Sequence, residues 1–167
     1  GLTAQQQLTI SLDPNARGPE RWAAYVADQD IDNQFDIYVQ DLCAPTVGTP
    51  TRVNGASASG DVSTSSNDVK LSPAGNALAF IGDLDTAGQE EVYVVDLRNG
   101  PQTGEAVRIL DAASSFQEAI DLRWSPDGSK IGIRYDSTSG RNEMWVADVS
   151  NLSAPQQAVL VSQPGTS

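Results

Sequence analysis

Apolar residues along this chain gather in short runs that are separated by polar stretches rich in Asp, Gly, Asn, Ser and Pro. The runs contain many Val, Ile, Tyr, Trp and Phe residues, which favour strands, and the separating residues are those that form turns. The pattern therefore predicts short strands joined by turns, and it does not favour helices.

Two of these runs recur along the chain at nearly constant spacing. The segment 36–42 (DIYVQDL) returns as 91–97 (EVYVVDL) and as 143–149 (EMWVADV), at offsets of 55 and 52 residues. An upstream set shows nearly the same period, with the members 22–28 (WAAYVAD), 77–83 (ALAFIGD) and 130–136 (KIGIRYD). Two independent segments that keep one period indicate a repeat architecture.

Each repeat contains four predicted strands, so the whole chain, residues 1–167, is predicted to be one domain of three similar units. The strands are expected at 8–12, 21–27, 35–42 and 51–53, at 69–72, 76–82, 91–97 and 106–110, and at 119–125, 130–135, 142–149 and 158–161. Tight turns are expected at 73–75 (PAG) and 126–128 (PDG), because Pro presets one φ angle and Gly permits a positive one.

The third repeat resembles the TolB-type β-propeller repeat through 125–128 (SPDG), a strand ending in Asp136, and 143–148 (EMWVAD). The second repeat is similar through 72–75 (SPAG) and 91–96 (EVYVVD), whereas the first departs from the motif near Pro14. The resemblance implies an all-β fold, a partial β-propeller of three four-stranded antiparallel blades at about residues 8–56, 68–112 and 118–163.

Three blades do not close a ring, since propellers typically have four to eight blades and TolB-like ones resemble six-bladed rings. The chain could be a segment of a longer protein, two copies could pair into a six-bladed ring, or a partner could cover the open ends. We favour a segment or domain of something larger and place the homodimer second, because no self-complementary face is evident in the sequence.

Composition narrows the functions that this chain could have. The formal net charge of -12 disfavours binding to nucleic acid or to anionic lipid. Histidine is absent, which removes the usual general base and the commonest ligand of zinc, copper and haem iron. No apolar run approaches the roughly 18 residues of a membrane-spanning helix. We therefore predict a protein that is not an enzyme and has no direct membrane span.

The densest acidic segment is 28–36 (DQDIDNQFD), which resembles the beginning of a calcium loop. Its alternating carboxylates could supply oxygen ligands to Ca²⁺, and the candidate ligands are Asp28, Asp30, Asp32 and Asp36. The expected glycine is replaced by Asn33 and the expected bidentate glutamate by Val39. Asp and Asn also form ordinary turns, so no cofactor other than a possible calcium ion is predicted. Solvent-exposed charges are the default interpretation of the arginines in the third repeat, and Arg123 and Arg134 are the better candidates for buried ion pairs with neighbouring acids.

The leading hypothesis is a non-catalytic propeller module that binds another protein or a larger complex outside the cytoplasm, in the periplasm or at the cell surface. The low lysine content, Lys70 and Lys130 only, and the TolB resemblance favour this location. One alternative is a segment of a larger enzyme, resembling the gating propellers of prolyl-oligopeptidase-like peptidases or the metal-centred propellers of some lyases and lactonases. Another alternative is a calcium-dependent adhesion module.

Overall fold

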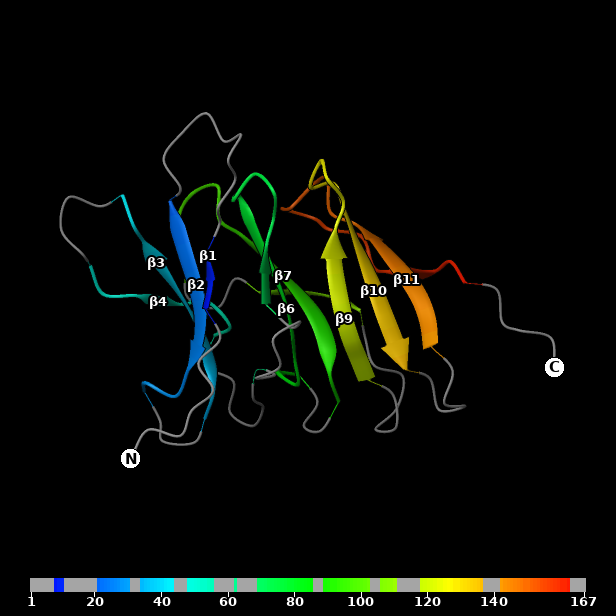
Figure 1. Ribbon diagram of the computed structural model, residues 1–167, viewed down its shortest axis with the longest axis horizontal. Coiled ribbons are helices and arrows are strands. Elements are labelled where there is room, and N and C mark those ends of the chain that lie inside the picture. The colour runs from blue at the N-terminus through cyan, green and yellow to red at the C-terminus, as the bar shows by residue number, and fades with distance from the viewer. Residues whose placement is uncertain are drawn as a thin grey trace.

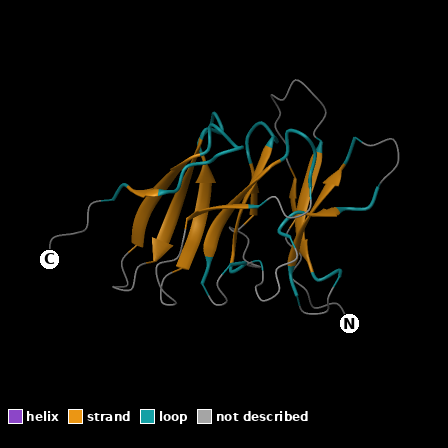
Figure 2. Cartoon of the chain, turned by 180° about the vertical axis from the view of Figure 1, so that it is seen from behind, coloured by secondary structure: helices purple, strands orange, loops and turns teal. Residues whose placement is uncertain are grey.

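The computed structural model describes residues 8–10, 21–30, 34–43, 48–55, 62, 69–85, 89–102, 106–110, 118–136 and 142–162. These residues form strands and loops and no helix (Figure 2), so no helix among them is long and apolar enough to cross a membrane. The predicted all-β class is confirmed.

The strands form three four-stranded antiparallel sheets, which lie side by side in chain order (Figure 1). Sheet 1 contains β1 (Leu8–Ile10), β2 (Trp22–Ala27), β3 (Asp36–Asp41) and β4 (Thr51–Arg52). Sheet 2 contains β5 (Val69–Leu71), β6 (Ala77–Gly82), β7 (Glu91–Asp96) and β8 (Val107–Leu110). Sheet 3 contains β9 (Glu118–Trp124), β10 (Lys130–Asp136), β11 (Asn142–Asp148) and β12 (Val159–Leu160). Every sheet thus uses four strands that are consecutive in the chain, as the repeat predicted.

Each sheet has two faces, because successive side chains of a strand point to opposite sides. We call the side toward the next sheet in the chain the following face and the opposite side the preceding face. The following face of sheet 1 packs on the preceding face of sheet 2, and the joint cluster includes Trp22, Ala24, Val26, Ile37, Val39, Leu78, Phe80, Tyr93, Val95 and Leu97. Sheet 2 packs on sheet 3 in the same way, through Ala77, Ala79, Ile81, Val92, Val94, Leu122, Ile131, Ile133, Tyr135, Ala147 and Val149. One packing relation therefore occurs twice.

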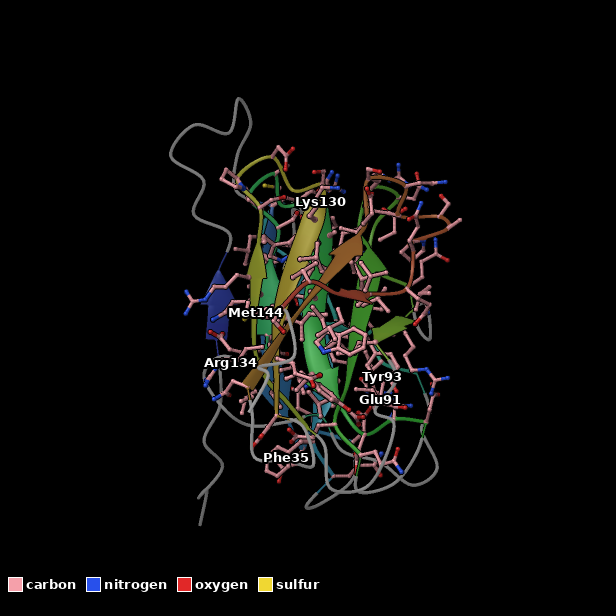
Figure 3. The ribbon with its side chains drawn as sticks, turned by 90° about the vertical axis from the view of Figure 1, so that its right-hand side faces the viewer. Phe35, Glu91, Tyr93, Lys130, Arg134 and Met144 are labelled. Atoms are coloured by element: carbon pink, nitrogen blue, oxygen red, sulfur yellow. The ribbon has the colours of Figure 1, made fainter. Side chains whose placement is uncertain are left out.

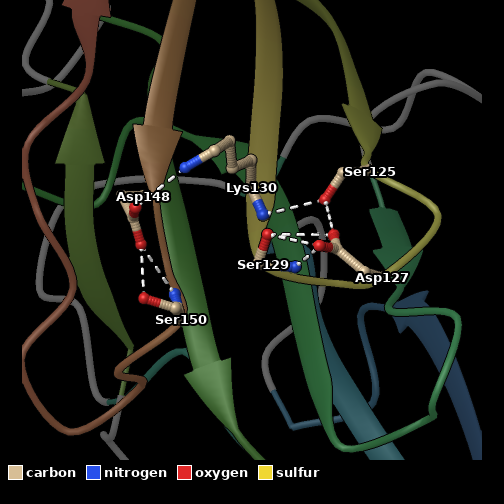
Figure 4. A network of polar contacts seen from close by, with 6 residues as sticks. All are labelled: Ser125, Asp127, Ser129, Lys130, Asp148 and Ser150. Atoms are coloured by element: carbon tan, nitrogen blue, oxygen red, sulfur yellow. Dashed lines mark hydrogen bonds and ion pairs between the residues drawn. The ribbon is translucent and has the colours of Figure 1, made fainter.

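The Ser-Pro-x-Gly motif forms the turn between the first and second strands of sheets 2 and 3 (Figure 4 shows sheet 3). The Gly128 N–H donates to the Ser125 carbonyl at 2.9 Å, and the Lys130 N–H donates to Ser125 Oγ, also at 2.9 Å. In sheet 2 the Gly75 N–H donates to the Ser72 carbonyl at 2.8 Å. The φ angles of Gly75 and Gly128 are 65° and 70°, in the left-handed region that glycine adopts easily. The predicted role of this motif is confirmed.

Gly128→Ala is expected to lower the free energy of unfolding by about 1–2 kcal/mol, the usual cost of a left-handed conformation for an L-residue. A steric clash does not add to this cost, because a Cβ at Gly128 would meet only Pro73 Cδ, at the ordinary contact distance of 3.8 Å. Gly48→Ala is the matched control, since a Cβ there meets nothing within 4 Å and Gly48 has no positive φ. Urea denaturation of both variants measures the difference, and equal stabilities would contradict the assigned strain.

A segment before β12 ties sheet 3 to the outer edge of sheet 2. The Ala158 N–H donates to the Ile109 carbonyl at 2.7 Å, and Gln157 Nε2 donates to the Arg108 carbonyl at 2.7 Å. Ala158 is thereby drawn toward β8, and β12 begins one residue later than the predicted strand 158–161. The length of this last strand was thus decided by a contact with another sheet.

Candidate functional site

The acid that opens the third strand is completely buried in sheet 1 and in sheet 2. In sheet 1, Asp36 accepts hydrogen bonds from Asn54 Nδ2 at 2.8 Å and from the Arg52 guanidinium at 3.2 Å. The same guanidinium lies 3.6 Å from the Asp30 carboxylate in the preceding hairpin. Asp36 therefore ties β3, β4 and the hairpin together.

Sheet 2 repeats this arrangement about 55 residues later along the chain. Glu91 accepts hydrogen bonds from the Arg108 guanidinium at 2.7 Å and from the Tyr93 hydroxyl at 2.5 Å. Arg108 also lies 3.3 Å from the Asp85 carboxylate, whose backbone N–H donates to the Tyr93 hydroxyl at 3.1 Å. A buried acid, a hairpin acid and a fourth-strand arginine thus recur as one unit, which we call the acid–arginine tie.

Sheet 3 lacks the arginine of this tie. Arg52 and Arg108 stand opposite Tyr38 and Tyr93, whereas Leu160 stands opposite Trp145 at the equivalent register. Glu143, which is partly exposed, accepts a hydrogen bond from Trp145 Nε1 at 3.1 Å. The outer strand of sheet 3 is consequently apolar and exposed where the other two sheets form ion pairs.

The structure brings two of the four predicted calcium ligands together, but the cation between them is the Arg52 guanidinium. Asp30 and Asp36 both pair with Arg52, Asp28 is half-buried in the same hairpin, and Asp32 lies outside the described residues. Among the described residues no group of three or more Asp, Glu, Cys or His side chains could hold a metal ion. For Asp30 and Asp36 the tie supplies a structural role, and calcium binding stays a prediction.

The tyrosines of the ties predict a loss of stability at alkaline pH. Burial raises the pKa of Tyr93, and the Glu91 carboxylate raises it further; burial together with Asp30 raises the pKa of Tyr38 to about 12. The folded state therefore keeps phenol protons that the unfolded chain releases near pH 10, so stability is full below pH 10 and falls above it. The slope approaches about 1.4 kcal/mol per pH unit for each tyrosine.

Urea midpoints between pH 8 and pH 11 measure this effect. The double variant Tyr38→Phe, Tyr93→Phe should flatten the alkaline part of the curve, because a phenyl ring has no proton to lose. An alkaline slope that is unchanged in the double variant would assign the titration to other groups.

The following face of sheet 3 has a different chemistry from the equivalent faces of sheets 1 and 2. Positions that hold Ala77, Ile81 and Val92 in sheet 2 hold Lys130, Arg134 and Met144 in sheet 3, and these three side chains are exposed (Figure 3). We call this surface the outer face of sheet 3. It also includes Asp121, Arg123, Gly132, Asp136, Val146, Asp148, Val159 and Val161.

Two ion pairs lie within the polar half of the outer face. Lys130 Nζ lies 2.8 Å from the Asp148 carboxylate, which also accepts hydrogen bonds from Ser150 (Figure 4), and these contacts lower the pKa of Asp148. Arg123 lies 3.3 Å from Asp121. Arg134 has no ion-pair partner among the described residues.

Arg123 and Arg134 are both exposed, which agrees with the default interpretation and not with the alternative of buried ion pairs. The sequence did contain a signal for the outer face. Aligned repeats show Lys130 in the column of Ala77 and Arg134 in the column of Ile81. Charged residues in the third repeat at positions that are apolar in the second repeat indicate that this face of the third sheet is exposed to solvent.

A groove of about 420 Å³ with a mixed polar and apolar lining lies between the β7–β8 connection and the loop after β11, and its lining residues are Asp96, Asn99, Gln102, Ala106, Val107, Leu152 and Ser153. Arg98 spans this region, with its guanidinium 2.6 Å from the Asp96 carboxylate and 3.1 Å from Ser153 Oγ. These hydrogen bonds lower the pKa of Asp96. The contacts join sheets 2 and 3, and Asp96 is held in an ion pair.

Comparison with known proteins supports the fold. No protein-family model and no curated protein matches the chain. Among solved structures, the chain is similar to the β-propeller domain of the Trilobed protease from Pyrococcus furiosus, which is described as having an open velcro topology. The match has a TM-score of 0.51 and 16% sequence identity, and it covers 95% of this chain and 43% of that one.

This likeness shows a β-propeller type of fold. The chain spans less than half of the length of the matched domain. At this level of identity the match carries no information on activity or partners. The TolB-like family and the division into three blades stay predictions.

Proposed function

We propose that the chain is a non-catalytic module of three propeller blades, TolB-like in sequence, that binds protein partners in a larger assembly outside the cytoplasm. The outer face of sheet 3 carries this proposal. Met144, Val159 and Val161 are 44%, 61% and 55% exposed there, although the equivalent faces of sheets 1 and 2 are buried by a neighbouring sheet. Exposed apolar side chains rimmed by charges are typical of protein interaction surfaces.

The acid–arginine ties support a non-catalytic role. Asp36 and Glu91 are the buried acids among the described residues, and buried acids are common in active sites. Both carboxylates are instead held by arginines at equivalent positions. A pair that recurs in two sheets fits the architecture of the repeat better than a single active centre.

Affinity capture from the source cells tests this proposal. The native chain should capture a defined protein, and a variant with Met144→Lys and Arg134→Glu on the outer face should lose it. A variant with Val107→Lys and Arg21→Glu, which changes an exposed valine and an exposed arginine of the other sheets, is the matched control and should retain it. Identical capture by all three proteins would contradict the assigned surface.

A second candidate function is the alternative that the sequence resemblance to peptidase propellers implies, and the matched propeller domain also belongs to a protease. Under this alternative the chain is the propeller part of a larger enzyme, and the chemistry lies in another domain. Reading the gene beyond Ser167 distinguishes the two functions, since a Gly-x-Ser-x-Gly nucleophile elbow would favour the enzyme.

A further inference from the structure

Among the side chains that the structure describes, the outer face of sheet 3 carries as many cations as acids, although the chain as a whole is strongly acidic. The described charged side chains on it are three acids and three cations, namely Asp121, Asp136, Asp148, Arg123, Lys130 and Arg134. The other residues therefore carry the whole net charge of -12. Two copies of the chain repel each other through most orientations, whereas the described charges of this face balance and add no net repulsion.

The same face combines its charges with an apolar half. The charges lie on β9 and β10 and at the end of β11, whereas Met144, Val146, Val159 and Val161 lie together on β11, on β12 and directly after β12. Gly132 stands between the two halves, opposite Val146 and Arg123. When two copies pair face to face, the two-fold axis lies in the plane of the interface. Such an arrangement allows the apolar half of one copy to pack on the apolar half of the other, and cations of one copy to face acids of the other.

A six-bladed ring of two copies would instead join sheet 3 of one copy to the preceding face of sheet 1 in the other. That face of sheet 1 carries Ala23, Tyr25 and Tyr38. Tyr38 is only 2% exposed, Ala23 is also buried, and the Tyr25 and Tyr38 rings stack at 5.6 Å. Tyr38 and Ala23 are thus buried, unlike the exposed Met144, Val159 and Val161 of the outer face of sheet 3.

We propose that the outer face of sheet 3 is a homodimer interface, in which two copies pair face to face about a two-fold axis. This inference rests on the proposed function, because it names the partner at the same surface. The apolar half supplies the buried contact, and Arg134, which has no ion-pair partner among the described residues, gains acids from the second copy.

Light scattering coupled to size exclusion measures the mass of the purified chain over a concentration series. The native chain should reach twice 17.6 kDa. Met144→Lys should give a monomer, and Arg134→Glu should raise the dimer dissociation constant about tenfold or more, because it places like charges across the interface. Val107→Lys is the control, since Val107 is 43% exposed on β8 and should leave the dimer intact. Thermal unfolding checks that each variant is folded.

A native chain that stays monomeric at a concentration of about 100 μM would overturn the homodimer, because its dissociation constant would then lie above that concentration. So would a dimer whose mass is unchanged by Met144→Lys. Affinity capture separates this failure from failure of the proposed function. If the chain is monomeric but the outer-face variant loses a captured foreign protein, the face serves that protein and only the homodimer is wrong. A monomer with no capture at all contradicts both.

Discussion

Phe80→Ala is expected to lower the free energy of unfolding by about 4 kcal/mol, the largest effect of any substitution considered for this chain. Phe80 is completely buried between sheets 1 and 2, and its ring stacks on Tyr93 with a centroid separation of 5.3 Å and an interplanar angle of 15°. The truncation removes the packing of two sheets and the aromatic pair together. Urea denaturation followed by tryptophan fluorescence measures the loss.

Tyr25→Ala is the matched control for Phe80→Ala. Tyr25 occupies the equivalent register in sheet 1 and stacks on Tyr38, but its side chain is only half-buried and does not belong to the cluster between sheets 1 and 2. We expect a loss of about 2 kcal/mol, since less apolar surface returns to water. Equal losses at Tyr25 and Phe80 would show that the interface between sheets 1 and 2 contributes little to stability.

Glu91→Ala is expected to lower the free energy of unfolding by about 3 kcal/mol. Removal of one member of a buried ion pair usually costs about 3–5 kcal/mol. The substitution leaves Arg108 without the carboxylate at 2.7 Å and the Tyr93 hydroxyl without its acceptor. Arg108 remains partly hydrated and keeps Asp85, so the loss should fall at the lower end of that range. The same denaturation experiment measures the change.

The matching substitution in sheet 3 is Glu143→Ala. Glu143 opens β11 as Glu91 opens β7, but it is partly exposed and its described contact is the Trp145 indole at 3.1 Å. We expect a loss of about 1 kcal/mol or less, as for a single hydrogen bond near the surface. A cost at Glu143 equal to that at Glu91 would show that the arginine does not distinguish the two sites.

The repeat made most of the fold predictable, because the information needed for a strand and a tight turn is local. The apolar runs and the Ser-Pro-x-Gly turns located all the strands within a few residues, as the equivalent hydrogen bonds of Ser72 and Ser125 illustrate. The bounds were wrong where a distant segment competes for a backbone group, as at Ala158, which bonds to Ile109 of another sheet.

The candidate site was less predictable, because the role of a charge depends on what lies opposite it. Asp30 and Asp36 form part of an acidic run in the sequence, and only the pairing of β3 with β4 brings Arg52 to them. For Arg134 the sequence left a buried ion pair open beside solvent exposure, and the structure shows an exposed side chain.

The sequence by itself determined the all-β class, the three units and their turns, since spacing and residue type act through local backbone preferences. Only the tertiary structure decided which neighbouring sheet each apolar face meets. A strand pattern with apolar residues on both sides does not say which side meets a neighbour, and the packing of sheet 1 on sheet 2 and of sheet 2 on sheet 3 supplies that answer. In that packing the outer face of sheet 3 is exposed. Lys130, Arg134 and Met144 occupy the positions there that are apolar and buried in sheet 2.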